Sequence, residues 1–76
     1  MPRRNSRKYL VIIERAEDGK YAAYVPDLPG CAVVGYATAA QARRSITTTI
    51  RMHLEGMVED GQPIPKPSTK CAYVAA

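Results

Sequence analysis

One helix-forming segment limits the fold of this chain more than any other feature of its sequence. Between Ala39 and Gly61, apolar residues recur at spacings of four and three, at Ala42, Ile46, Ile50, Leu54 and Met57. This spacing predicts a helix with one apolar stripe. Thr38, with Gln41 three residues later, is typical of a capping box, and Gly61 is the expected end of the helix. In a chain of 76 residues, one such helix leaves room for a small sheet and covers only one face of it.

Four short segments predict the strands of that sheet, because they contain β-branched and aromatic residues between turn signals. They are residues 8–14, 21–25, 31–36 and 70–76. Asp18-Gly19, between the first two segments, is typical of a hairpin turn. The sequence therefore predicts a single α+β domain with the element order β-β-β-α-β.

The stretch PDLPG, which follows the second predicted strand, is the stiffest connection in that sheet. Pro29-Gly30 fits the two central positions of a type II turn, where Gly30 takes a positive φ. Pro26 restricts the residue before it to extended geometry and so ends the strand. We expect Asp27 to accept hydrogen bonds from nearby backbone amides. Leu28 has two open roles: burial beneath the sheet, or presentation on a preorganised contact rim for a partner.

The first predicted strand is apolar on both faces, since it contains four consecutive apolar residues, Leu10 to Ile13. Such runs are typical of strands that are buried on both sides. The helix covers one face, so we expect a second subunit or another protein to cover the other. The alternative is a partly exposed strand that tyrosine side chains shield.

The net charge of +4 comes from the beginning of the chain. Arg3, Arg4, Arg7 and Lys8 lie there, whereas residues 9–76 contain seven basic and seven acidic side chains. We interpret residues 1–7 as a basic flexible arm and residues 8–76 as the folded domain. The arm either solubilises the chain or contacts the phosphates of a nucleic acid.

Residues that enzymes use are sparse in this sequence. Cys31 and Cys71 lack the spacing of a zinc site, and His53 is the single histidine, so we expect no catalytic residue, metal or cofactor. A residual metal-dependent nuclease would depend on Glu14 or Glu55, and the last predicted strand adds no carboxylate. With no secretory signal and no apolar run near the ~20 residues of a membrane helix, we expect a cytoplasmic protein with free thiols and no membrane partner.

Two long stretches, YLVIIERAEDGKYAAYVPDLPGCAVVGYAT and AQARRSITTTIRMHLEGMVEDGQPIPKPS, resemble HicB-family antitoxins. The resemblance covers roughly residues 8–75, and PDLPGC and HLEGMVEDGQPIPKP are its most specific pieces. It implies a truncated ribonuclease H-like fold: a mixed four-stranded sheet of order 3-2-1-4, with one helix on one face and the last strand parallel to the first. It also implies that Cys31 and Cys71 begin strands on opposite edges, which excludes an intrachain disulfide.

The resemblance implies a binding module and not an enzyme. Such antitoxins bind and block HicA, a small basic toxin that cleaves mRNA, and we expect this chain to self-associate, as a dimer or tetramer, and to occlude such a toxin. The candidate partner-contact residues are Tyr24, Asp27, Leu28 and Tyr36.

Two further expectations concern nucleic acid. HicB-family antitoxins commonly carry a C-terminal DNA-binding domain, and because this sequence ends at Ala76, we expect a short form without that domain. The alternative function is an orphan homo-oligomer that binds nucleic acid through its arm residues Arg3, Arg4, Arg7 and Lys8.

Overall fold

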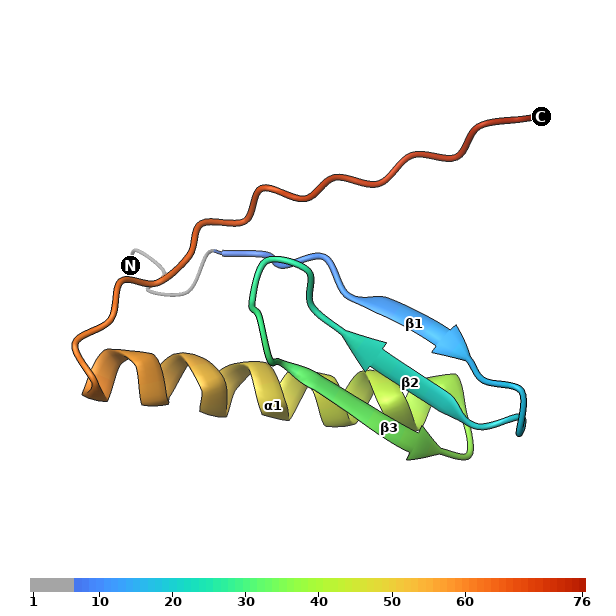
Figure 1. Ribbon diagram of the computed structural model, residues 1–76, viewed down its shortest axis with the longest axis horizontal. Coiled ribbons are helices and arrows are strands. Elements are labelled where there is room, and N and C mark those ends of the chain that lie inside the picture. The colour runs from blue at the N-terminus through green and yellow to red at the C-terminus, as the bar shows by residue number, and fades with distance from the viewer. Residues whose placement is uncertain (1–6) are drawn as a thin grey trace, which may run out of the picture.

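Three strands and one helix follow one another in the structure, a computed structural model that describes residues 7–76. They are β1 (Ile12–Arg15), β2 (Tyr21–Tyr24), β3 (Ala32–Tyr36) and α1 (Ala39–Glu59). The strands form an antiparallel sheet of order β1-β2-β3. Helix α1 lies across one face of this sheet and contacts all three strands (Figure 1). The fold is therefore α+β, as the sequence predicts.

Glycines with positive φ shape both connections within the sheet. Gly19, with φ +84°, lies in the β1–β2 hairpin, and Gly30, with φ +85°, lies in the turn before β3. The backbone N–H of Cys31 donates to the carbonyl oxygen of Leu28 at 3.0 Å. Residues 28–31 therefore form the predicted type II turn.

Both ends of α1 are capped as the sequence predicts. The backbone N–H of Gln41 donates to Oγ1 of Thr38 at 3.1 Å, and the side-chain oxygen of Gln41 accepts from the N–H of Ala37 at 3.2 Å. Beyond the last turn, Gly61 has φ +71° and its N–H donates to the carbonyl oxygen of Val58. These bonds satisfy backbone groups that a helix leaves unpaired at its ends.

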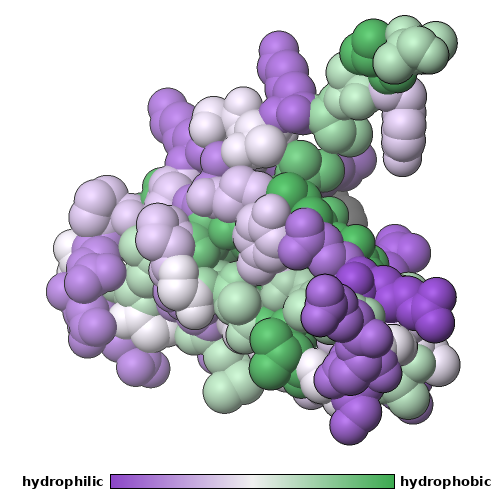
Figure 2. Space-filling model, turned by 45° about the vertical axis from the view of Figure 1, so that its right-hand side comes forward, coloured by the Kyte–Doolittle hydropathy of each residue, from purple (hydrophilic) through white to green (hydrophobic). Residues whose placement is uncertain are grey.

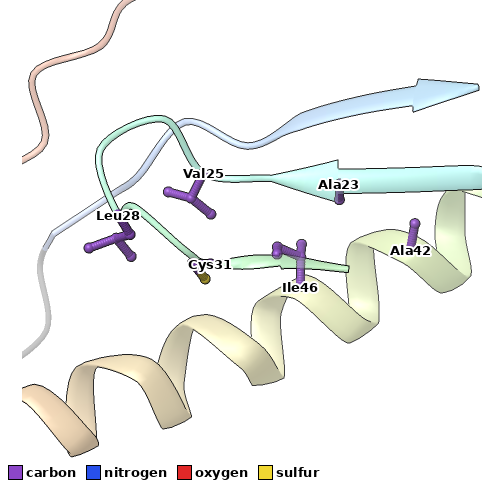
Figure 3. Packing of buried hydrophobic residues seen from close by; sticks show 6 residues of the cluster. All are labelled: Ala23, Val25, Leu28, Cys31, Ala42 and Ile46. Atoms are coloured by element: carbon purple, nitrogen blue, oxygen red, sulfur yellow. The ribbon is translucent and has the colours of Figure 1, made fainter. Parts of the chain in front are cut away.

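The core lies between the sheet and α1. Its buried residues are Ala23, Val25, Leu28, Cys31, Ala42 and Ile46. Figure 3 shows that residues at the two ends and in the middle of the β2–β3 loop point toward α1. Ile50 and Leu54, the next residues of the predicted helical stripe, pack half-buried against the cluster. Leu28 is 0% exposed, so burial is the role that the structure gives it.

The predicted fourth strand does not pair with the sheet in this structure. Residues 63–76 form no regular secondary structure, and the described part of the chain holds a three-stranded antiparallel sheet, not a mixed sheet of order 3-2-1-4. A strand exists only where a neighbour pairs with its backbone groups. Residues 70–76 instead run away from the body of the molecule (Figure 1). Only the β1-β2-β3 part of the predicted order is present.

Candidate interaction surface

The face of the sheet that points away from α1 is apolar and uncovered by residues 7–76. The strand register places Ile12 opposite Tyr24, and Tyr24 opposite Ala32. Residues that lie opposite one another share a face, and alternation along β3 adds Val34 to it. Tyr24 is 38% exposed and Val34 is 77% exposed. We call Ile12, Tyr24, Ala32 and Val34 the open face.

The other face of β1 is also apolar, as the consecutive apolar residues in the sequence predict. Ile13 lies opposite the buried Ala23, and Val11 packs against the core. Side chains on β1 therefore point alternately toward α1 and toward the open face. The helix covers only the first of these two sides, which leaves the second available to a partner.

β1 is an edge strand, because β2 is its single neighbour in the described sheet. Beside this edge, a shallow groove runs between β1 with its preceding residues and α1. Tyr9, Val11 and Ile13 line the groove on the sheet side, and Ile46 and Ile50 line it on the helix side. The groove continues along α1 toward the C-terminal end of the helix. Arg43 and Thr47 also line the helix side. An unpaired strand edge beside a groove with apolar side chains on both walls can accept a further strand.

Asp27 ties the chain that follows α1 to the β2–β3 loop. Its carboxylate accepts hydrogen bonds from the backbone N–H groups of Ser68 at 2.8 Å and Thr69 at 3.0 Å. It also accepts from the hydroxyl groups of Ser68 at 3.1 Å and Thr69 at 2.6 Å. The expectation that Asp27 binds nearby amides is thus wrong, because Ser68 and Thr69 lie 41 and 42 residues further along the chain. We call these four hydrogen bonds the Asp27 anchor.

The anchor also changes the acidity of Asp27. The hydroxyl of Thr69 contributes most, and with the amides of Thr69 and Ser68 it lowers the pKa of Asp27 to about 2, because all these donors stabilise the ionised carboxylate. A second contact, from the hydroxyl of Tyr9 to the carbonyl oxygen of Pro65, holds the same segment. Together they set the direction in which the chain leaves the body.

The segment beyond the anchor is extended, apolar and exposed. Residues 71–76 carry no charged side chain. Tyr73 is 102% exposed and Val74 is 83% exposed. Figure 2 shows the end of this segment standing clear of the rest of the surface, at the upper right. We call residues 70–76 the C-terminal tail.

The predicted partner-contact residues do not gather on one surface. Tyr24 lies on the open face, Asp27 holds the anchor and Leu28 lies in the core. The hydroxyl of Tyr36 lies 2.7 Å from Oγ of Ser45 on α1, so this side chain is on the helix side of the sheet. Neither the anchor nor the groove beside β1 is indicated by the sequence alone. No local sequence signal links a loop aspartate to two hydroxyl residues so far along the chain.

The predicted arm is described only in part. Arg3 and Arg4 lie outside the described residues, whereas Arg7 and Lys8 are exposed. Arg7 lines the groove beside α1, as does Arg51 of the helix. Two basic side chains and one acidic side chain, Glu55, thus border this end of the groove.

Other kinds of site find little support in the described residues. Within residues 7–76, no three side chains of the metal-ligating types gather closely enough to hold an ion. Both cysteines are free: Cys71 is exposed, and Cys31 is buried, which raises the pKa of its thiol. Among the same residues, no helix combines the length and the apolar character needed to cross a bilayer.

Comparison with known proteins matches the sequence of this chain to one family. The family described as the HicB_like antitoxin of bacterial toxin-antitoxin systems matches residues 9–76. A UPF0150 protein of Thermoplasma acidophilum is 41% identical over 59 residues, which are 78% of this chain and 84% of that protein. A UPF0150 protein of Synechocystis sp. is 38% identical over 58 residues, which are 76% of this chain and 72% of that protein.

A phage protein is also similar to this chain. It is an uncharacterized 14.9 kDa protein from the rep-hol intergenic region of Haemophilus phage HP1. The two sequences are 38% identical over 66 residues, which are 87% of this chain and 48% of the phage protein. The chain thus spans about half the length of this relative.

Proposed function

This chain belongs to the HicB-like antitoxin family, and from that premise we propose that it neutralises a small HicA-type toxin that cleaves mRNA. It acts by binding: it covers the active surface of the toxin and performs no chemistry of its own. The single observation that carries the proposal beyond the family is the open face, an apolar sheet surface that residues 7–76 leave uncovered.

The open face has the composition of an interface core. Tyr24 offers a large aromatic side chain at low entropic cost, and Ile12 and Val34 add aliphatic area around it. Glu14 alternates with Ile12 along β1 and therefore lies on the same side of the sheet. Its exposed carboxylate gives this face a group that attracts a basic partner. Tyr24 is the one predicted contact residue that we place at this interface.

We further propose that the chain acts in the cytoplasm as a self-associated dimer or tetramer. The described core contains six buried residues, and a chain of this length stabilises itself only marginally. A second copy would bury part of the apolar surface that one copy leaves exposed.

A pull-down of the tagged chain from its native host tests the toxin proposal. We expect mass spectrometry to identify a small basic protein at equal stoichiometry, and expression of that protein alone to arrest growth. The double variant Tyr24→Asp/Val34→Asp should lose the partner while its circular dichroism stays unchanged. The matched control is Met52→Asp, on an α1 residue that is 65% exposed, and it should retain the partner. Equal recovery by both variants would contradict the assignment to the open face.

Nucleic-acid binding through the arm is the second candidate function. It is favoured by the exposed Arg7 and Lys8 and by the position of Arg7 near Arg51 along the groove. In the full chain, a variant with Arg3, Arg4, Arg7 and Lys8 changed to glutamine should lose RNA and DNA binding. The binding of the unchanged chain should weaken steeply as salt rises, because phosphate contacts release counterions. Binding that survives the four changes would exclude the arm as the site.

A further inference from the structure

We infer that the C-terminal tail of one copy pairs with the β1 edge of a second copy, as an added strand, and that the second copy returns its own tail in the same way. This inference rests on the proposed self-association and is independent of toxin binding. It names the segment that joins the copies and the surface that receives it.

The receiving surface is the unpaired edge of β1 together with the groove beside it. The edge presents backbone N–H and C=O groups that have no strand partner among the described residues. The groove is apolar on the sheet side, at Val11 and Ile13, and mixed on the helix side, where Ile46 and Ile50 alternate with Arg43 and Thr47. A strand placed here gains main-chain hydrogen bonds from the edge, and alternate side chains enter the groove.

The tail has the sequence of a strand with two buried faces. Cys71, Tyr73 and Ala75 alternate with Ala72, Val74 and Ala76; neither set contains a charged side chain, and the hydroxyl of Tyr73 is the one strongly polar group in them. One set can therefore cover the groove while the other extends the open face beside Ile12, and this holds for either orientation of the strand. Seven residues span roughly 23 Å at about 3.3 Å each, which is enough to follow the whole of β1.

The tail does not meet the β1 edge of its own chain. The Asp27 anchor fixes Ser68 and Thr69 on the β2–β3 loop, and from there the tail diverges from β1 (Figure 1). The exposure of Tyr73, 102%, shows that its side chain touches no part of the described body. Each copy thus offers one unpaired strand and the β1 edge, and a two-fold pair of copies joins the strand of each copy to the β1 edge of the other.

Sedimentation equilibrium of the full chain, mass 8.3 kDa, tests this inference. We expect the unchanged chain to sediment as a species of twice that mass at micromolar concentration. The double variant Tyr73→Asp/Val74→Asp should weaken self-association by about a hundredfold or more, because it places an unpaired carboxylate in the groove whichever of the two sets faces it. Both side chains are exposed in the single chain, so its circular dichroism should not change. Met52→Asp, on an exposed helix residue, is the matched control and should remain dimeric.

Hydrogen exchange locates the pairing. In the dimer, backbone amides of β1 and of residues 70–76 should be protected, and the tail variant should lose both sets of protection together. A tail variant that keeps the dimer mass would overturn the inference, as would a protected tail in a monomeric chain, which would mean that the tail closes on its own β1.

The open-face variant Tyr24→Asp/Val34→Asp separates this inference from the proposed function. If the tails are exchanged between copies, this variant should stay dimeric while it loses the toxin. Loss of the dimer in this variant, with the tail variant still dimeric, would instead assign self-association to the open face and overturn the exchange of tails. A wild-type dimer that requires its tails but captures no toxin would support the exchange and contradict the proposed function.

Discussion

Two segments of equal length, residues 25–31 and the C-terminal tail, behave in opposite ways. The loop at 25–31 supplies Val25, Leu28 and Cys31 to the core and pairs its own backbone, with three hydrogen bonds of 3.0–3.1 Å among these same residues. The tail forms no backbone hydrogen bond with the described residues and exposes its two largest apolar side chains. The loop carries the prolines and the turn glycine, whereas the tail has strand composition throughout.

The difference shows that a turn and a strand depend on different partners. A type II turn is fixed by residues three positions apart, so Pro29 and Gly30 are sufficient to order it. The backbone N–H and C=O groups of a strand find protein hydrogen-bond partners only on a neighbouring strand. The loop therefore forms its backbone hydrogen bonds within one chain. The tail can form its own only with a strand edge that lies elsewhere.

The largest expected effect is the loss of core packing beneath the loop. Leu28→Ala should lower the free energy of unfolding by about 2–5 kcal/mol, because it opens a cavity where the side chain is 0% exposed. Urea denaturation, below the concentration at which copies associate, measures this. Val74→Ala in the tail is the control and should change the value by less than about 0.5 kcal/mol. Equal losses of unfolding free energy in the two variants would mean that the tail is packed like the loop.

Backbone geometry at the loop should give the next largest effect. Gly30→Ala should lower the free energy of unfolding by about 1–2 kcal/mol, because φ +85° is strained for alanine. A Cβ atom at Gly30 meets no atom within 4 Å, and the same holds at Gly56 in α1. Gly56→Ala should therefore stabilise the chain by up to about 1 kcal/mol, through helix propensity alone. If both variants shift the denaturation midpoint in the same direction, backbone conformation is not what distinguishes the loop.

The Asp27 anchor is the point where the loop and the chain leading to the tail meet, and its loss should be local. Asp27→Asn removes the negative charge that strengthens these four hydrogen bonds and leaves one acceptor oxygen where the carboxylate has two. Hydrogen exchange at these two amides should become faster, while the exchange of core amides stays unchanged. Glu59→Gln, a neutralisation of an exposed residue at the end of α1, is the matched control. Unchanged protection of both amides in Asp27→Asn would show that the anchor does not depend on the carboxylate.

Acid should release the same anchor, with the smallest effect of the series. The pKa of Asp27 is lowered from 3.8 to about 2 in the folded chain, so the ionised carboxylate favours the anchored state. This contribution is fully present above pH 3.8 and is lost as the pH falls through about 2. The amide chemical shift of Thr69 should follow this titration, with a midpoint near pH 2. A midpoint at the ordinary aspartate value would contradict the four hydrogen bonds.

Most of the fold follows from local sequence patterns. The stripe from Ala42 to Leu54, the cap at Thr38 and the glycines at positions 19 and 30 each act over a few residues, and the structure confirms all of them. The first strand begins at Ile12, four residues after the predicted start at residue 8. Its bounds depend on where the partner strand pairs with it. The segment 70–76 has the composition of a strand but lacks a neighbour.

The candidate site follows from the sequence less completely. Consecutive apolar residues in β1 predict an uncovered face, and the structure places Tyr24 on that face. They do not predict that Tyr36 turns toward Ser45 on α1, because the face of a residue in β3 depends on the irregular pairing between β2 and β3. That irregularity lies beside Gly35, which has φ +85°.

The sequence by itself determined the helix, its caps, the hairpin and the type II turn, because each depends on interactions between residues that are near neighbours in the chain. Only the tertiary structure decided that Leu28 is buried, that Asp27 binds Ser68 and Thr69, and that the tail leaves β1 unpaired. The Asp27 anchor depends on contacts across 41 and 42 residues, the burial of Leu28 depends on packing against α1, and the free tail depends on the absence of a contact. Local propensity is the same for a strand that pairs within its chain and for one that remains free to pair with another.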